Sequence, residues 1–395
     1  MRRTPTTTAE AARPAPSDAA APDARLTVTV LAALRDAGLA AAGVAGAQPF
    51  LGTREELYRR RRAGLHGGMN FTYRDPDRST DPSRTVVGAR SLVVGAYGYL
   101  RRPPPPLPGR PVAAGRVARY AWGDRYAALT AALEAGAAVL RAAGHQAVVV
   151  ADHNALVDRE AAFRAGVGWY GRNANLLLPG RGSWFVLGSV VTDAALVASE
   201  PVAPGCGTCT RCEPACPTQA IVAPGVVDAR RCLAWLLQDT GSFPREHRVA
   251  LGDRLYGCDE CQEVCPPNLV ASRHDAATAA AGDRAVVDAV ALLVDDDAAV
   301  LAAAGRWYVA ERDARHLRRN ALVVLGNTAD LDDARVNAVL GRCLRHADPL
   351  VRAHAVWAAA RLGRPELADD LAATEADPMV RDELDRRGDV PVRSR

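Results

Sequence analysis

Eight of the nine cysteines in this chain lie between Cys206 and Cys265, and their spacing is typical of iron–sulfur ligands. The first run is C-x2-C-x2-C-x3-C followed by proline, and the second ends in C-x2-C-x3-C-P. In bacterial ferredoxins the first pattern holds [4Fe–4S] clusters, and its fourth cysteine ligates the other cluster. The same crossover predicts two [4Fe–4S] clusters here. One would take Cys206, Cys209, Cys212 and Cys265, and the other Cys216, Cys232, Cys258 and Cys261.

Zinc is the alternative occupant of these cysteines, since paired C-x-x-C motifs also build tetrahedral zinc sites. Two zinc ions would use all eight thiolates, but the x2-x2-x3-Pro spacing favours clusters. Two neighbouring clusters form an electron relay, and this relay is embedded in a chain of 395 residues. We therefore expect electrons to pass to something bound within residues 26–200. The remaining cysteine, Cys343, is expected to be a small buried hydrophobe.

The composition is that of a soluble globular protein, with 49% hydrophobic and 24% charged residues. No apolar run approaches the roughly 18 residues of a membrane-spanning helix, and the N-terminus lacks the apolar stretch of a secretory signal. These observations predict a cytoplasmic protein with no membrane association. All 49 basic residues are arginine, and a net charge of +4 is weak support for nucleic-acid binding by itself.

The pattern of apolar and polar residues predicts the elements that position this chemistry. After a disordered extension in residues 1–24, it indicates an α+β fold in three parts. In residues 25–200 we expect strands at Ser91–Tyr99, Ala147–Ala151 and Trp184–Thr192, with helices at Leu26–Leu39 and Tyr126–Ala143. Residues 201–270 form the cysteine-rich domain, which is ferredoxin-like. Residues 271–395 are predicted to be almost entirely helical.

The helical part contains an internal repeat. The motif D-P-x-V-R begins at Asp348 and again at Asp377, and LRRNALVVLG resembles VRAHAVWAAARLG in its apolar positions. Helical units that repeat about every 30–35 residues are typical of HEAT-like solenoids. Asp followed by Pro suits a helix start. An ordinary helical bundle is the alternative.

Four blocks of sequence resemble the epoxyqueuosine reductases, a family of cobalamin-dependent enzymes that modify tRNA. They are ADHNALVDREAAFRAGVGWYGRNANLLL, RYAWGDRY, RGSWFVLGSVVTD and GCDECQEVCPPN. The likeness covers nearly the whole chain after the N-terminal extension. Ala127, Ala155 and Asp158 stand where the family commonly has His, Pro and Glu. These departures affect neither the cluster ligands nor the proton donor of the family, and they concern only the detail of the loops.

The resemblance implies reduction of epoxyqueuosine to queuosine at the wobble position of tRNA, by cob(I)alamin fed from the two clusters. It implies a corrinoid-binding α+β domain in residues 25–200, a ferredoxin-like two-cluster domain and C-terminal HEAT-like repeats. The family's proton donor falls on Asp152. Its cobalamin contacts fall on Arg78, Ala118, Asp152, Asn173, Leu176, Leu187, Leu233 and Asp259.

The position of Asp152 suits a general acid. It follows the apolar strand Ala147–Ala151, and a carboxyl buried at a strand end is expected to keep the proton that epoxide opening needs. Turn formation and helix capping are the alternatives for an aspartate in such a place. The glycines of AGVGWYGRN indicate close backbone approach, either to a cofactor or between strands. Simple turns are the alternative for each of them. No D-x-H-x-x-G segment offers a cobalt-ligating His.

Leu233 and Asp259 each follow a ligand of the second cluster, namely Cys232 and Cys258. This adjacency predicts that the second cluster is the last relay before cobalt. The first would then lie further out, where an external electron donor could reach it.

Arginines at helical spacing in the repeat region suggest a surface for tRNA phosphates. They are Arg312, Arg315, Arg318, Arg319, Arg342, Arg345 and Arg352. A solvated helix face with internal Asp and Glu partners is the alternative. Two other functions remain open for a chain that we expect to be monomeric. One is a corrinoid reductive dehalogenase, and the other is a non-catalytic electron-transfer module that docks through its repeats.

Overall fold

The computed structural model describes residues 21–105, 111–274, 276–330 and 333–393, and its N-terminal half is built on one antiparallel sheet. The strand order is β1 (Ala41–Gly46), β2 (Ser91–Gly98), β7 (Phe185–Thr192) and β4 (Ala147–Ala151). The three predicted strands are confirmed. Residues 1–20 of the predicted extension lie outside the described residues. The extension ends earlier than predicted, because Asp23 already caps the first helix with its side chain.

Strand β1 is the one that the sequence analysis missed. Its sequence, AAGVAG, has a single β-branched residue and therefore a weak strand signal. The small residues are required by packing, because a Cβ on Gly43 would lie 2.0 Å from the carbonyl oxygen of Ala165. Every residue of β1 pairs with β2, from Ala41 opposite Ala96 to Gly46 opposite Ser91.

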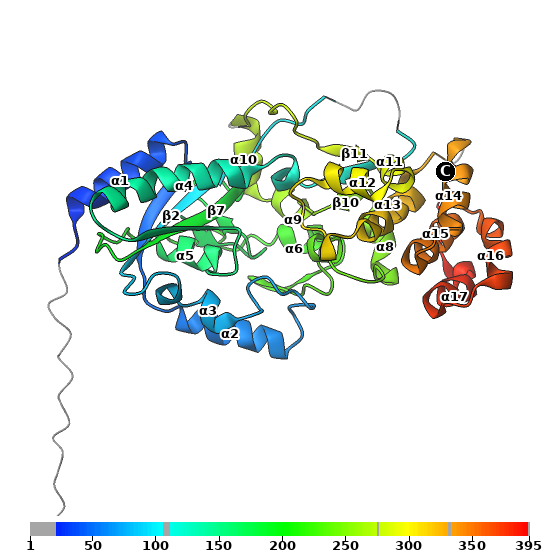
Figure 1. Ribbon diagram of the computed structural model, residues 1–395, viewed down its shortest axis with the longest axis horizontal. Coiled ribbons are helices and arrows are strands. Elements are labelled where there is room, and N and C mark those ends of the chain that lie inside the picture. Colours follow the sequence, from blue (N-terminus) through cyan, green and yellow to red (C-terminus); the bar gives the residue numbers. More distant parts are fainter. Residues whose placement is uncertain (1–20, 106–110, 275, 331–332, 394–395) are drawn as a thin grey trace, which may run out of the picture.

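Helices cover both faces of this sheet (Figure 1). Helices α1 (Ala24–Asp36) and α4 (Arg125–Ala142) pack on one face, and they confirm the two predicted helices. The short helix α5 (Asp158–Arg164) packs on the other. Along β2 the side chains alternate, so that Val93 faces α4 while Leu92 and Val94 face α5. The sheet is therefore buried on both sides, and the loops at its ends are left to carry function.

The cysteine-rich segment consists of short elements wrapped beside the sheet. Its helices are α6 (Cys212–Ala215), α7 (Leu233–Leu236), α8 (Arg245–Leu251), α9 (Glu260–Glu263) and α10 (Pro266–His274). The segment also contains a small hairpin of β8 (Ile221–Ala223) and β9 (Val226–Val227). A second hairpin, of β5 (Trp169–Tyr170) and β6 (Leu176–Leu177), precedes the segment in the chain. Two further helices, α2 (Leu51–Arg62) and α3 (Pro76–Ser79), occupy the arginine-rich stretch where no element was predicted.

A second sheet ties the three predicted domains together. Its order is β10 (Arg254–Tyr256), β3 (Ala114–Val117) and β11 (Val286–Asp288). The first strand comes from the cysteine-rich segment, the second from residues 25–200 and the third from the C-terminal part. The prediction that the chain is nearly all helical after residue 271 is therefore wrong for its first part, because the backbone pairing of β11 outweighs the helical character of the residues around it.

The rest of the C-terminal part is helical and lies at the opposite end of the molecule from α1 (Figure 1). Its helices are α11 (Ala289–Val294), α12 (Asp297–Ala304), α13 (Ala314–Thr328), α14 (Arg335–Leu344), α15 (Pro349–Arg361), α16 (Asp369–Thr374) and α17 (Pro378–Asp385). The side chains of Asp348 and Asp377 cap α15 and α17, with Pro in the first turn, as the repeated motif predicts. Cys343 is buried in the core between these helices, as expected. Among the described residues, no helix is long and apolar enough to cross a membrane.

An ion pair joins the capped helices. Arg352 of α15 binds Glu375, which precedes α17, through two bonds of 2.7 and 3.0 Å. The hydrogen bond from Arg352 lowers the pKa of Glu375 from 4.5 to about 2. A carboxylate with a lowered pKa in the folded state stabilises the fold above its unfolded pKa. This contribution is lost as the pH falls from 4.5 towards 2.

The Arg352→Ala variant is therefore expected to be less stable than the parent at pH 7, by about 1.5–3 kcal/mol. The difference should shrink when unfolding is measured at pH 3, because Glu375 is then protonated in the unfolded chain and still ionised in the folded parent. Denaturant unfolding at the two pH values measures it. Arg386→Ala is the control, since it removes only an exposed pair with Asp382 and should cost much less. An equal loss at both pH values would contradict the role of this pair.

Candidate functional site

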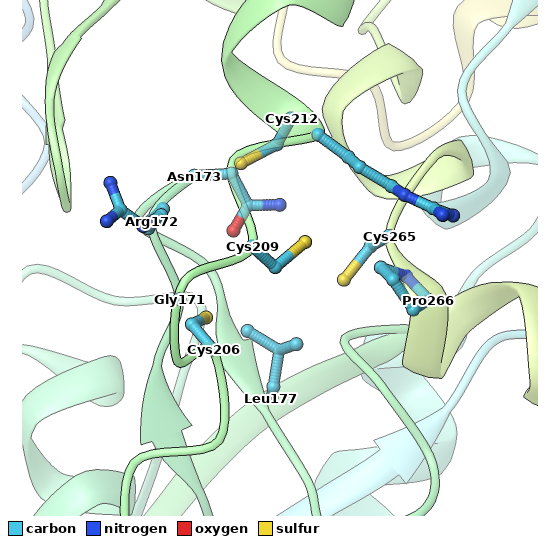
Figure 2. A pocket seen from close by; sticks show the side chains of 10 residues that line it. Gly171, Arg172, Asn173, Leu177, Cys206, Cys209, Cys212, Cys265 and Pro266 are labelled. Carbon is cyan, nitrogen blue, oxygen red and sulfur yellow. The ribbon is translucent and has the colours of Figure 1, made fainter.

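Four cysteines of the predicted first set surround one small cavity (Figure 2). Cys206 and Cys209 lie in the loop before α6, Cys212 is its first residue, and Cys265 immediately precedes α10. The cavity is also lined by Gly171, Arg172, Asn173, Leu177, Arg211 and Pro266. Cys265 is thus brought to three cysteines that lie more than fifty positions earlier, which is the crossover that the spacing predicts.

The second set also converges. Burial raises the pKa of Cys261 well above its ordinary value, and the neighbouring thiols of Cys258, Cys232 and Cys216 raise it further. Burial likewise raises the pKa of Cys258 to about 12. Thiols crowded in this way need cationic iron beside them before they can become thiolate ligands.

The chemistry of the two sets suits clusters. A single zinc ion needs its ligands about 2.0–2.3 Å from the metal. In the described ranges, no three His, Cys, Asp or Glu side chains are grouped closely enough to hold one ion. The four cysteines of the first set instead stand around a cavity, as the corners of a larger group would require.

Three of the eight predicted cobalamin-contacting residues gather beside the second cysteine set. Asn173 donates from Nδ2 to the carbonyl oxygen of Cys261 at 3.1 Å. The carboxylate of Asp259 accepts a bond of 2.7 Å from the backbone N–H of Arg119, the residue after Ala118. Burial is the main cause that raises the pKa of Asp259 to about 6. Asn173 also lines the cavity of the first set, so it lies between the two.

The other predicted contacts are more dispersed. Leu176 is buried and Leu187 half-buried in the core on the α5 face of the large sheet. Leu233 is buried in a different core, formed with the C-terminal helices. The Arg78 side chain is exposed on α3. The structure therefore brings Ala118, Asn173 and Asp259 together beside the second cysteine set. Leu233 directly follows Cys232 of that set, and Arg78 lies on the exposed side of α3.

Asp152 stands at the end of β4, as predicted, but its side chain is not buried. It is 42% exposed, and its Oδ2 atom is 3.2 Å from Nη2 of Arg306. Its backbone has a φ of +51°, in the left-handed region that residues with a Cβ rarely adopt. The expectation of a buried carboxyl is therefore wrong, because the chain turns outward immediately after β4. The side chain is presented at the surface instead.

The loop that follows Asp152 is held by neighbouring backbone. Asn154 accepts a bond of 2.7 Å at Oδ1 from the N–H of Thr72, and Val157 donates its N–H to the carbonyl oxygen of Ser79 at 2.9 Å. Asp158, the first residue of α5, carries a buried Oδ1 atom with no hydrogen-bond partner. Burial and the nearby charge of Asp152 raise the pKa of Asp158 well above its usual range.

Sequence reasoning missed Arg306 as a partner of Asp152. The two residues are 154 positions apart, and Arg306 lies outside every motif that the sequence analysis used. No spacing signal could have paired them. Asp158 was noted only as a departure from the family pattern.

The glycines of AGVGWYGRN serve packing between backbone segments. A Cβ on Gly166 would lie 2.0 Å from the carbonyl oxygen of Glu200, and one on Gly168 would lie 2.2 Å from that of Leu177. A Cβ on Gly171 would meet the Leu177 side chain at 2.3 Å. Close approach between backbone segments therefore holds for Gly166 and Gly168. Gly166 also has the positive φ of a turn, and Gly171 lines the cavity of the first cysteine set.

The arginines predicted to bind tRNA mostly have partners within the protein. Arg319 is completely buried and donates to the carbonyl oxygens of Leu236 and Gly241, while Arg318 is buried against Asp297. Arg315 pairs with Asp313, Arg352 with Glu375, and Arg312 and Arg342 donate to backbone carbonyls. Of these seven arginines, Arg345 is exposed and makes no side-chain hydrogen bond or ion pair to a described residue. The seven arginines therefore do not form one solvent-facing set, because Arg318 and Arg319 are buried and Arg315 and Arg352 pair with carboxylates. Arg312, Arg342 and Arg345 are exposed.

Comparison with known proteins gives matches to a cluster-binding domain and to whole enzymes. Residues 205–268 match the family described as the 4Fe-4S double cluster binding domain. The chain is 36% identical over 366 residues to an epoxyqueuosine reductase of Xanthomonas campestris pv. campestris, covering 89% of this chain and 98% of that protein. It is 28% identical over 374 residues to the epoxyqueuosine reductase of Bacillus anthracis, covering 92% and 96%.

Solved structures give the same result. A crystal structure of epoxyqueuosine reductase with an epoxyqueuosine-modified tRNA stem loop matches with a TM-score of 0.84 and 26% identity, covering 93% of this chain and 98% of that one. The Bacillus subtilis epoxyqueuosine reductase matches with a TM-score of 0.83 and 26% identity, covering 93% and 99%. In that structure an aspartate-bearing catalytic loop is swung out of the active site.

Proposed function

This chain belongs to the epoxyqueuosine reductase family, and we infer that it reduces epoxyqueuosine to queuosine at the wobble position of tRNA. The observation that carries the inference is the 36% identity to a named reductase over 98% of that protein's length. The double cluster segment and the aspartate loop at the end of β4 both fall within the matched fold.

The reaction converts an epoxide to an alkene. Both carbon–oxygen bonds break, a carbon–carbon double bond forms, and the oxygen leaves as water after taking up two electrons and two protons. The two cysteine sets are proposed to hold the [4Fe–4S] clusters that deliver the electrons one at a time. Asp152 is proposed to deliver one of the protons as a general acid. Its exposed side chain is accessible to a nucleoside that enters from outside.

Cobalamin is the proposed second cofactor, and in reduced form it would supply a strong electron donor or nucleophile for opening the epoxide. Its proposed contacts are Arg78, Ala118, Asp152, Asn173, Leu176, Leu187, Leu233 and Asp259. Two buried polar atoms without hydrogen-bond partners support a place for this cofactor near the face of the large sheet that α5 covers. They are Asp158 Oδ1 and Ser189 Oγ, the latter on β7. Asn173, Ala118 and Asp259 would hold the group beside the second cysteine set.

The same three residues support the proposed order of the relay. Asn173 bonds to the backbone of Cys261, and Asp259 directly follows Cys258. Because Asn173 also lines the cavity of the first set, the position of Asp259 after Cys258 is what favours a cofactor beside the second cluster. The first would then receive electrons from an external donor. The cavity of the first set already includes Asn173, which keeps the two clusters close together.

Binding of tRNA is proposed to involve the C-terminal helices as HEAT-like repeats. The capped helices α15 and α17 pack against each other, and α13 packs on α15, as stacked repeat units would. The proposed division into domains remains 25–200, 201–270 and 271–395, joined by the β10–β3–β11 sheet. We propose that the protein acts in the cytoplasm as a monomer.

Nucleoside analysis tests the function directly. Transfer RNA from a strain that lacks this protein should accumulate epoxyqueuosine, and expression of the intact chain should convert it to queuosine. Unchanged queuosine in the deletion strain would reject the proposal, provided that no second reductase is encoded.

Protein purified without oxygen is expected to contain about eight irons per chain, because two cubes hold four each. Iron and acid-labile sulfide assays measure this, with visible absorbance as a second readout. A zinc-filled protein without sulfide would contradict the assignment of the two cysteine sets.

A further inference from the structure

An arginine from the C-terminal part reaches the catalytic loop. Arg306 lies between α12 and η3 (Ala310–Arg312), and its Nη2 donates to Oδ2 of Asp152 at 3.2 Å. Its Nη1 donates to Oδ1 of Asp124 at 3.3 Å, and its guanidinium carbon lies 5.5 Å from the ring centre of Tyr126. One cation is therefore held by two carboxylates and an aromatic ring, all contributed by the N-terminal half of the chain.

The backbone that carries Arg306 is itself fixed. The next residue, Trp307, donates from Nε1 to the carbonyl oxygen of Ala121 at 2.9 Å and stacks on Tyr256, with ring centres 4.6 Å apart. The N–H of Tyr308 donates to the hydroxyl of Tyr256 at 2.8 Å. Because the residues after Arg306 are bound in this way, a carboxylate that binds its guanidinium is held in a defined place.

Asp152 requires such a hold. A positive φ is uncommon for a residue with a Cβ, and such backbone persists where the surrounding structure fixes it. Among the described residues, the Asp152 carboxylate pairs with Arg306 alone. The pairing uses Oδ2, and no described residue donates a hydrogen bond to Oδ1. One carboxylate oxygen is therefore held, while the other has no hydrogen-bond partner among the described residues.

We propose that Arg306 is a positioning residue for the reduction, which holds the Asp152 loop so that Oδ1 faces the substrate. The proposal rests on the function inferred above and deepens it. The C-terminal part then contributes to the catalytic step by fixing the acid, in addition to any part it takes in binding RNA.

The rate test compares single-turnover reduction by the reconstituted full chain. Arg306→Ala should slow it roughly 10- to 100-fold, as expected when a reacting group loses its orientation. The Kd for the modified stem loop should change little. Arg306→Lys should recover part of the rate, since an ammonium can bind one carboxylate but lacks the planar fork that reaches two. In an Asp152→Asn background, Arg306→Ala should cost nothing further, because the proton donor is already absent.

A second readout does not depend on activity. Hydrogen exchange of the backbone amides in residues 152–157 should be faster in Arg306→Ala than in the parent. Arg386→Ala is the matched control, because Arg386 is equally exposed at 51% and is also paired with a carboxylate, that of Asp382. It should change neither the exchange of this loop nor the rate.

Different outcomes overturn different claims. If the parent reduces epoxyqueuosine and Arg306→Ala does so equally fast with unchanged exchange, the positioning role is rejected. If Arg306→Ala slows the Asp152→Asn variant by the same factor as the parent, Arg306 acts independently of Asp152 and the proposal fails. If the parent shows no reduction, the proposed function fails, and the exchange experiment still decides whether Arg306 holds the loop.

Discussion

The Asp152→Asn variant is expected to reduce epoxyqueuosine about 10²- to 10⁴-fold more slowly than the parent, the usual cost of removing a general acid. Asparagine keeps the size of the side chain and can still accept a bond from Arg306, but it has no carboxyl proton to give. Folding and iron content should be unchanged, because Asp152 is exposed and lies outside both cysteine sets. Single-turnover assays under reducing conditions measure the loss.

Asp193 provides a matched control for this experiment. It follows β7 directly, as Asp152 follows β4, and its carboxylate is 31% exposed and paired with His145 at 3.2 Å. Because β4 and β7 are antiparallel neighbours, Asp193 and Asp152 lie at opposite ends of these two strands. Asp193→Asn should reduce the substrate at the parental rate. A parental rate for Asp152→Asn would place the proton donor elsewhere.

Loss of the second cluster is expected to have an equally large effect. The Cys261→Ala variant should hold about four irons instead of about eight, and its reduction of epoxyqueuosine should fall to background, since one cube is lost from the relay. Cys209→Ala should also lose about four irons. It should retain more activity than Cys261→Ala when a small chemical reductant replaces the external donor, because the cluster proposed to lie beside the cofactor remains.

Cys343→Ala is the control for these variants. Its thiol is buried among the C-terminal helices, away from both sets, so the iron content should stay at the parental value. Binding of the modified stem loop shows whether the ligand variants remain folded. Greater residual activity in Cys261→Ala than in Cys209→Ala would reverse the proposed order of the clusters.

Much of this arrangement could be predicted where the signal is local. Ligand spacing grouped the cysteines, β-branched runs located β2, β4 and β7, and the two Asp-Pro motifs located the starts of α15 and α17. The strand β1 escaped because Ala and Gly carry little strand preference, although they allow the close approach at Gly43. The strand β1 forms because its residues pair with β2, which lies about fifty residues later in the chain.

The failures concern residues whose roles are set by distant partners. Helical spacing made Arg318 and Arg319 look like a charged surface, but the fold buries both against carbonyl groups and Asp297. The strand before Asp152 is apolar, and nothing local indicates that the chain turns outward after it. The pairing of Asp152 with Arg306 joins two segments that only the folded chain brings together.

The sheet formed by β10, β3 and β11 limits how this enzyme can accommodate an RNA. Its strands come from all three parts of the chain, so a hinge between the catalytic and helical parts would have to leave paired backbone groups without partners. Movement of the helical end relative to Asp152 would therefore have to break these strand pairs. Under the proposed function, an RNA that binds the helical end and reaches Asp152 would adapt its own conformation, by extruding the modified nucleoside of its anticodon loop. The energetic burden of fitting then falls on the nucleic acid.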